Sequence, residues 1–137
     1  MSCNCEKCGG RITGLAHIGI HVKDMARSKE FYVGKLGMEL THEASNNGVA
    51  LALVQQDSMI LELIELPNEA PRSAGIVDHI AFAVEDIETL VCKLIENGVV
   101  FEKNGEVGVV PNIFGGIKNA WLNGPDGEIL ELFEFIK

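Results

Sequence analysis

The sequence predicts an α+β fold that consists of two paired βαβββ modules. The main evidence is a stretch that occurs twice: His17 stands seven residues before Asp24, and His79 stands seven residues before Asp86. Each histidine belongs to a segment that alternates as a β-strand does, and each aspartate introduces a segment with helical spacing. Two later strands share a second pattern, Leu-Glu-Leu-x-Glu, which begins at residues 61 and 130. The chain therefore consists of one unit written twice.

The first module is expected to span residues 14–66. Its order is strand, helix and three strands, and we expect these elements at residues 14–22, 24–36, 38–43, 49–55 and 59–66. Asp24 suits the N-cap of the helix, and Gly37 stands just past its end. Asn46-Asn47-Gly48 predicts a turn between the second and third strands.

The second module is expected to span residues 77–137, after a linker at residues 67–76 that contains two prolines. It repeats the same order, with strands expected at residues 77–84, 99–102, 117–123 and 128–135 and a helix at residues 87–97. Asp86 is expected to cap this helix, and Gly98 to end it. Residues 104–116 are expected to form a long loop, and Gly124-Pro125-Asp126-Gly127 predicts a turn.

Composition and charge exclude several classes of protein. The chain has 137 residues, of which 47% are hydrophobic, so it is too apolar for the disordered class. Its net charge of −9 argues against a nucleic acid or an anionic membrane as partner, since both need a basic surface. No apolar run approaches the roughly 20 residues that span a bilayer, and the N-terminus has no signal-peptide core. We therefore expect a cytoplasmic protein with one domain, residues 14–137.

Residues 1–13 are expected to form an N-terminal tail, which contains Cys3, Cys5 and Cys8. Without a secretory context these cysteines do not indicate a disulfide framework. A closed zinc site needs four ligands, and the sequence offers no fourth nearby. We expect an oxidisable tail, and the alternative is a thiolate site that a second chain completes.

His17, Glu62, His79 and Glu131 are the candidate site residues. On its strand, His79 shares one face with two alanines, which leave a hollow beside the imidazole. Glu62 and Glu131, one in each copy of the Leu-Glu-Leu-x-Glu pattern, share their faces with apolar residues, where a carboxylate is costly unless a cation or donor compensates it. Glu65 and Glu134, the last residues of the pattern, are expected to be solvated.

Two histidines and two glutamates at equivalent positions suggest a metal site. Nitrogen and oxygen ligands of this kind suit zinc, nickel, cobalt, manganese or ferrous iron. The alternative is one core ion pair that the duplication repeated. We favour the metal, since a structural duplication would not need two buried acids, and uncompensated buried acids are costly.

The sequence resembles the vicinal oxygen chelate superfamily and, within it, the glyoxalase I (lactoylglutathione lyase) type. The resemblance extends from Gly14 to Phe135. The residues on which the resemblance rests are His17 in Leu-Ala-His-Ile-Gly-Ile, Phe31-Tyr32 with Leu36-Gly37-Met38, Glu62 in Ile-Leu-Glu-Leu, His79 in Asp-His-Ile-Ala-Phe, and Gly124-Pro125-Asp126-Gly127 before Glu131. It implies the glyoxalase/bleomycin-resistance/dioxygenase fold.

The resemblance also implies a reaction and an assembly. In glyoxalase I, two histidines and two glutamates bind one divalent ion, often in a cleft between two subunits, so we expect a homodimer. The short chain resembles the compact bacterial type, which implies nickel or cobalt before zinc. The implied reaction converts the hemithioacetal of a 2-oxoaldehyde such as methylglyoxal into a 2-hydroxyacyl thioester. Glu131 is then the principal base and Glu62 its counterpart.

Two positions depart from the glutathione-dependent pattern. Where bacterial glyoxalase I has an arginine and an asparagine that hold glutathione, this chain has His21 and Leu66. We therefore expect another thiol as co-substrate. The runner-up is an enzyme like methylmalonyl-CoA epimerase, which residues 17–20, 41–43 and 48–50 also resemble. The short linker and the 125–127 turn favour the glyoxalase type. A third alternative is a non-enzymatic small-molecule binder, but the full set of four ligands argues against it. Glu62, as the fourth ligand, also argues against an extradiol dioxygenase.

Overall fold

The computed structural model describes residues 10, 15–68, 77, 79–112 and 114–136. The predicted cysteine tail, apart from Gly10, and most of the predicted linker lie outside these residues. No helix among the described residues combines the length and the apolar character needed to cross a membrane.

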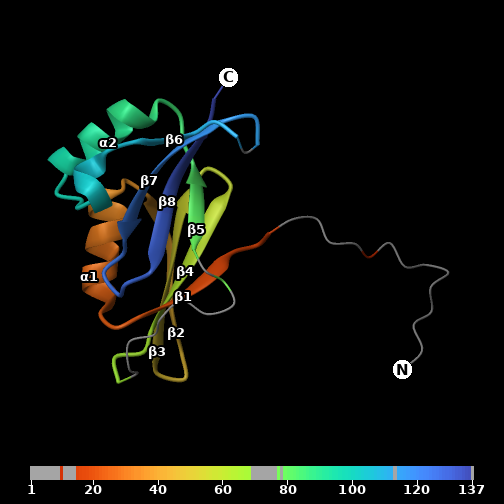
Figure 1. Ribbon diagram of the computed structural model, residues 1–137. Coiled ribbons are helices and arrows are strands. Elements are labelled where there is room, and N and C mark those ends of the chain that lie inside the picture. Colours follow the sequence, from red (N-terminus) through yellow and green to blue (C-terminus); the bar gives the residue numbers. More distant parts are fainter. Residues whose placement is uncertain (1–9, 11–14, 69–76, 78, 113, 137) are drawn as a thin grey trace.

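Two four-stranded mixed sheets form the frame of the molecule and confirm the predicted fold (Figure 1). The first module contains β1 (Ile18–Val22), α1 (Met25–Lys29), η2 (Glu30–Lys35), β2 (Glu39–Asn46), β3 (Val49–Gln56) and β4 (Met59–Glu65). The second contains β5 (Ile80–Ala83), α2 (Ile87–Glu96), η3 (Glu102–Gly105), β6 (Gly108–Val110), β7 (Ile117–Asn123) and β8 (Ile129–Phe135).

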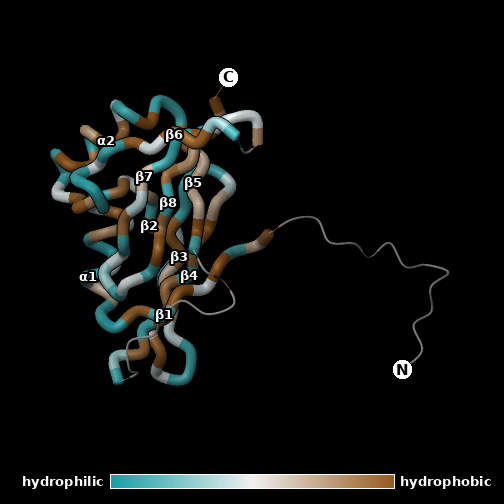
Figure 2. The backbone as a smooth tube through the Cα atoms, in the orientation of Figure 1, coloured by the Kyte–Doolittle hydropathy of each residue, from teal (hydrophilic) through white to brown (hydrophobic). Residues whose placement is uncertain are grey.

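The strand orders are the same in the two modules. They are β1-β4-β3-β2 and β5-β8-β7-β6, and in each sheet the first strand runs parallel to the last strand of its module. The β2–β3 turn has Asn47 and Gly48 at φ of 53° and 81°, as a two-residue hairpin turn requires. The tip of this hairpin is hydrophilic (Figure 2).

The first helix differs from the prediction in its second half. The α-helix ends at Lys29, and a π-helical segment continues to Lys35, with the Leu36 N–H donating to the Phe31 carbonyl at 2.9 Å. The wider turn places the consecutive rings of Phe31 and Tyr32 in the core, with centroids 4.9 Å apart. Local spacing did not reveal this because the packing of two adjacent aromatic rings selects the wider turn.

The predicted strand at residues 99–102 is wrong. Phe101 forms only an isolated bridge to Leu122, and the edge strand next to β7 is β6, which lies inside the predicted loop. Between them, Lys103 and Asn104 adopt left-handed φ values of 51° and 55°, which turns the chain. Gly105 follows against α2, where an added Cβ would lie 2.9 Å from the side chains of Val91 and Ile95.

A glutamate from the last strand of each module helps to cap the helix of that module. Asp24 caps α1 as predicted, accepting from the Arg27 N–H at 3.1 Å. The predicted cap at Asp86 is wrong, because its side chain makes no capping bond. Glu134 accepts instead from the N–H groups of Asp86 and Ile87, at 2.7 and 3.4 Å.

Glu65 has the same role in the first module. Its carboxylate accepts from the Met25 N–H at 2.7 Å. Glu65 and Glu134 are therefore helix-capping residues, and the prediction that both are solvated is wrong. Negative charge at the first turn of a helix also interacts favourably with the helix dipole.

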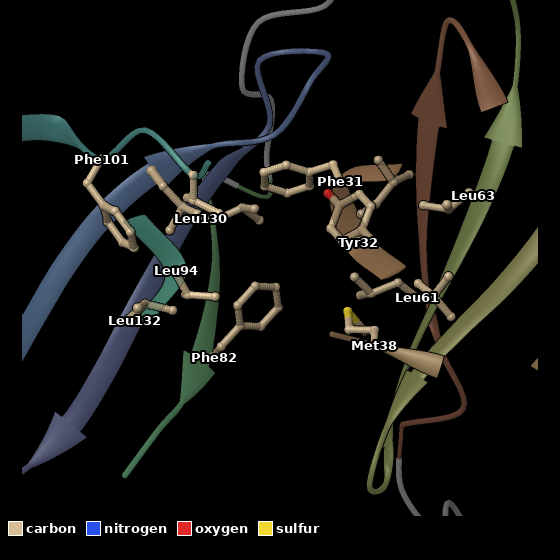
Figure 3. Close-up of a cluster of buried hydrophobic side chains, with 14 of the residues drawn as sticks. Phe31, Tyr32, Met38, Leu61, Leu63, Phe82, Leu94, Phe101, Leu130 and Leu132 are labelled. Atoms are coloured by element: carbon tan, nitrogen blue, oxygen red, sulfur yellow. The ribbon is translucent and has the colours of Figure 1, made fainter. Parts of the chain in front are cut away.

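One hydrophobic core joins the modules. Figure 1 shows α1 and α2 on the same side of the strands. Figure 3 shows Phe31, Tyr32, Met38, Leu61 and Leu63 of the first module facing Phe82, Leu94, Phe101, Leu130 and Leu132 of the second. Because strand side chains alternate, the residues next to these in β1, β4, β5 and β8 lie on the opposite face of each sheet.

Candidate functional site

The predicted site residues all lie on the sheet faces turned away from the core. Each histidine immediately precedes the first strand of its module, and each glutamate lies in the last strand. Gly19 is paired with Glu62, and Ala81 is paired with Glu131. These small residues leave room beside each carboxylate, into which the histidine two residues earlier extends.

In the second module, His79 and Glu131 form a close pair. The distance from His79 Nε2 to Glu131 Oε1 is 3.3 Å. Glu131 is only 5% exposed. Its other oxygen, Oε2, accepts a hydrogen bond of 2.9 Å from Asn119 Nδ2. The ring of Trp121 contacts the His79 ring edge-to-face, with centroids 5.1 Å apart.

In the first module, His17 and Glu62 form a looser and more exposed pair. His17 Nε2 lies 3.7 Å from Glu62 Oε1, and the two side chains are 45% and 25% exposed. Leu53 is the strand neighbour of Glu62, where Trp121 is the neighbour of Glu131. The duplicated pattern therefore gives two His–Glu pairs that differ in burial.

The four candidate residues form two separate His–Glu pairs within one chain. Among the described residues, no three His, Cys, Asp or Glu side chains lie close enough together to hold a metal ion. Each pair by itself could supply two ligands to one metal ion. A metal ion bonds to imidazole nitrogen and carboxylate oxygen at about 2.1 Å, so one ion can bridge two such atoms up to roughly 4.2 Å apart. Both observed separations lie below that limit. The donors thus fit two halves of a metal site.

The two positions at which we expected a departure from glutathione binding differ in their surroundings. His21 lies on the same face of β1 as His17 and is exposed. Leu66 follows β4, and its backbone N–H donates to the Val22 carbonyl at 2.8 Å. The Leu66 side chain has no hydrogen-bonding group, and His21 has two ring nitrogens where an arginine has five N–H donors.

A cavity of about 330 Å³ adjoins the second pair. Its lining consists of Glu102, Lys103, Glu106, Gly108, Asn119 and Trp121. Asn119 and Trp121 connect the cavity to the pair, because they contact Glu131 and His79. Neither residue was among the predicted site residues. The available signal was the alternation of β7, which puts a polar Asn119 and an aromatic Trp121 on one face.

Aromatic rings extend the same face beyond Glu131. Phe133 contacts Phe135 with centroids 5.0 Å apart, and Phe114 lies 6.5 Å from Phe133. Phe114 is 75% exposed and has a φ of 50°. A bulky residue in this conformation is strained, and such strain concentrates at functional surfaces. We refer to Phe114, Phe133 and Phe135 as the aromatic patch.

Comparison with known proteins shows the family of the chain and agrees with its fold. The family model of the Glyoxalase/Bleomycin resistance protein/Dioxygenase superfamily matches residues 14–132. The uncharacterized protein YwbC of Bacillus subtilis is 32% identical over 125 residues, covering 88% of this chain and 96% of its own. The uncharacterized protein YaeR of Escherichia coli is 31% identical over 126 residues, covering 86% and 93%. A crystal structure of a glyoxalase family protein from Enterococcus faecalis superposes with a TM-score of 0.73 at 29% identity, covering 89% and 98%.

Proposed function

Because the chain belongs to the Glyoxalase/Bleomycin resistance protein/Dioxygenase superfamily, we propose that it is a metal-dependent isomerase of the glyoxalase I type. Its substrate is the adduct of a 2-oxoaldehyde with a small thiol, and its product is a 2-hydroxyacyl thioester. The observation that supports this most is the presence of two His–Glu pairs, which occupy the same strand register in both modules. A carboxylate 5% exposed beside an imidazole suits proton transfer better than it suits a structural role.

The site is proposed to be completed by a second copy of the chain. Each copy would contribute His17 and Glu62 to one site and His79 and Glu131 to the other. A symmetric dimer uses the same surface on both copies, so it generates two such sites. The aromatic patch supports this assembly, since exposed apolar surface of this kind commonly marks an interface.

The chemistry divides between the ion and the side chains. A bound nickel, cobalt or zinc ion would supply a Lewis acid for two neighbouring substrate oxygens. Glu131 Oε1 would take the proton from the carbon next to the carbonyl and return it to the adjacent carbon. Glu62 would be its counterpart from the other half of the site. Trp121 and Phe133 would keep the surroundings apolar, which strengthens electrostatic interactions there.

The test is an assay of protein loaded with nickel, cobalt or zinc. Thioester formation from methylglyoxal is followed with a panel of thiols that includes glutathione. We expect turnover, with glutathione poorer than another thiol because His21 and Leu66 replace the groups that hold it. Glu131→Gln should retain metal through its amide oxygen but lose about 10²–10⁴-fold in turnover, because an amide accepts no proton.

Other outcomes would change the assignment. Interconversion of acyl-CoA epimers without thioester formation would favour the epimerase alternative. Ligand binding without metal and without turnover would favour the non-enzymatic binder. Full activity in Glu131→Gln would reject this residue as the base while leaving the reaction class intact.

A further inference from the structure

We propose that Asn119 is a positioning residue for Glu131, and that it makes the second module the proton-transferring half of the site. This rests on the proposed function above. The observation behind it is a difference between the modules: Glu131 is held by a side-chain amide, and the equivalent position in the first module is apolar.

The hydrogen bond determines which carboxylate oxygen is available. Asn119 Nδ2 donates to Glu131 Oε2 at 2.9 Å, and Oε1 is the oxygen 3.3 Å from His79 Nε2. With Oε2 engaged, the carboxylate cannot rotate freely about its last bond. Oε1 therefore stays directed toward His79, on the side where the proposed metal ion and substrate would lie. A group held in this way needs less reorganisation at each turnover.

The backbone of β6 fixes the amide in turn. Gly108 is paired with Asn119, and a Cβ built on Gly108 would lie 2.8 Å from Asn119 Oδ1. The missing side chain thus leaves the space that the amide oxygen occupies. Gly108 does not need a left-handed backbone, so its role here is the space it leaves. The amide nitrogen is thereby directed toward Glu131.

In the first module, apolar residues occupy the two equivalent positions. Leu51 occupies the register position of Asn119, two residues before the strand neighbour of the glutamate, and Ala44 occupies that of Gly108. The Glu62 side chain is 25% exposed, against 7% for Glu131. The two copies of the unit therefore differ at this position: an amide holds Glu131, whereas Glu62 has an apolar neighbour and is more exposed.

The test compares three variants with the wild type, each loaded with nickel. Asn119→Leu introduces the residue of the first module and removes the donor. Asn119→Gln keeps the donor, and the adjoining cavity has room for one more methylene. Gly108→Ala leaves Asn119 intact but fills the space of its amide oxygen. Gly10→Ala is the matched control, since an added Cβ there meets nothing within 4 Å.

For Asn119→Leu we expect kcat to fall about 10–100-fold and nickel affinity, measured by calorimetry, to fall about tenfold. KM should change little, because the amide does not touch the substrate. Gly108→Ala should lower kcat in the same direction by about 3–10-fold, and Asn119→Gln should stay within roughly fivefold of wild type. Thermal melting confirms that each variant is folded.

The outcomes separate this role from the proposed function. A wild type that neither binds metal nor turns over rejects both. An active wild type with kcat and nickel affinity unchanged in Asn119→Leu rejects the positioning role alone. A variant in which only KM rises also rejects the positioning role, since that result would mean that Asn119 contacts the substrate directly.

Discussion

The Tyr32 hydroxyl donates a hydrogen bond of 2.8 Å to Glu128 Oε2, and this bond joins the first module to the second. Tyr32 is fully buried. The same turn also accepts from the first module through Asp126, whose Oδ1 binds the Arg27 side chain at 2.7 Å and the Lys23 N–H at 3.1 Å. These contacts hold the modules in one arrangement and so determine which sheet faces point outward.

Removing the hydroxyl should destabilise the protein. We expect Tyr32→Phe to lower the free energy of unfolding by about 1–3 kcal/mol, because the Glu128 carboxylate loses the hydroxyl that donates to it. Urea denaturation measures this. Glu128→Gln is the control, since its amide oxygen still accepts and the loss should be smaller. A change in Tyr32→Phe below about 0.5 kcal/mol would mean that the bond does not hold the modules together.

Stability should also fall at high pH through the same tyrosine. Burial, and then the neighbouring Glu128 carboxylate, raise the pKa of Tyr32 well above its usual range. In the unfolded chain a tyrosine titrates near pH 10. Above that pH the unfolded state binds fewer protons than the folded state, so unfolding is favoured, by up to about 1.4 kcal/mol per pH unit.

The measurement compares unfolding of wild type and Tyr32→Phe from neutral pH upward. The extra loss should begin near pH 10 and should be absent in the variant. The chain has one tyrosine, so tyrosinate absorbance reports this group alone. Tyrosinate that forms at the ordinary pH while the fold remains intact would contradict the prediction.

The helix caps supplied by the last strands should contribute to stability. We expect Glu134→Ala to lower the free energy of unfolding by about 0.5–2 kcal/mol, as loss of a helix cap does. Amide hydrogen exchange should rise first in the opening turn of α2. Glu85→Ala, at an exposed glutamate one residue before Asp86, is the control and should have little effect. Equal effects of the two substitutions would show that Glu134 does not act as a cap.

A shared site predicts complementation between inactive variants. His17→Ala and Glu131→Gln should each be inactive alone. In a mixed dimer, one site carries both defects and the other is intact. After unfolding and refolding of an equal mixture, activity should return to about a quarter of wild type, because half of the dimers are mixed and each has one intact site.

The control for complementation is a mixture of His17→Ala with Glu62→Gln. Both substitutions lie in the first module, so every site retains one defect and no activity should return. Complete sites within single chains would give no recovery in either mixture. That result, together with a monomer by light scattering, would reject the dimeric site while leaving the metal ligands open.

Residues close in sequence were the ones that the patterns predicted well. The alternation of β4 and β8 placed Glu62 and Glu131 opposite the core residues around them, and Asp24 caps α1 through Arg27, three residues away. Glu134 and Asp86 are 48 residues apart, so no local pattern could show that one caps the other. The strand β6 was missed for a similar reason, since it forms only by pairing with β7.

The sequence by itself determined the duplicated βαβββ order, the inward and outward faces of the strands, and the choice of His17, Glu62, His79 and Glu131 as candidate residues. These follow from periodicity and from repetition, which operate along the chain. Only the tertiary structure decided that the pairs lie apart in one chain, that Asn119 holds Glu131, and that Tyr32 joins the modules. Each of these depends on strand register and on packing between distant segments, and such contacts are fixed when the sheets and the core assemble.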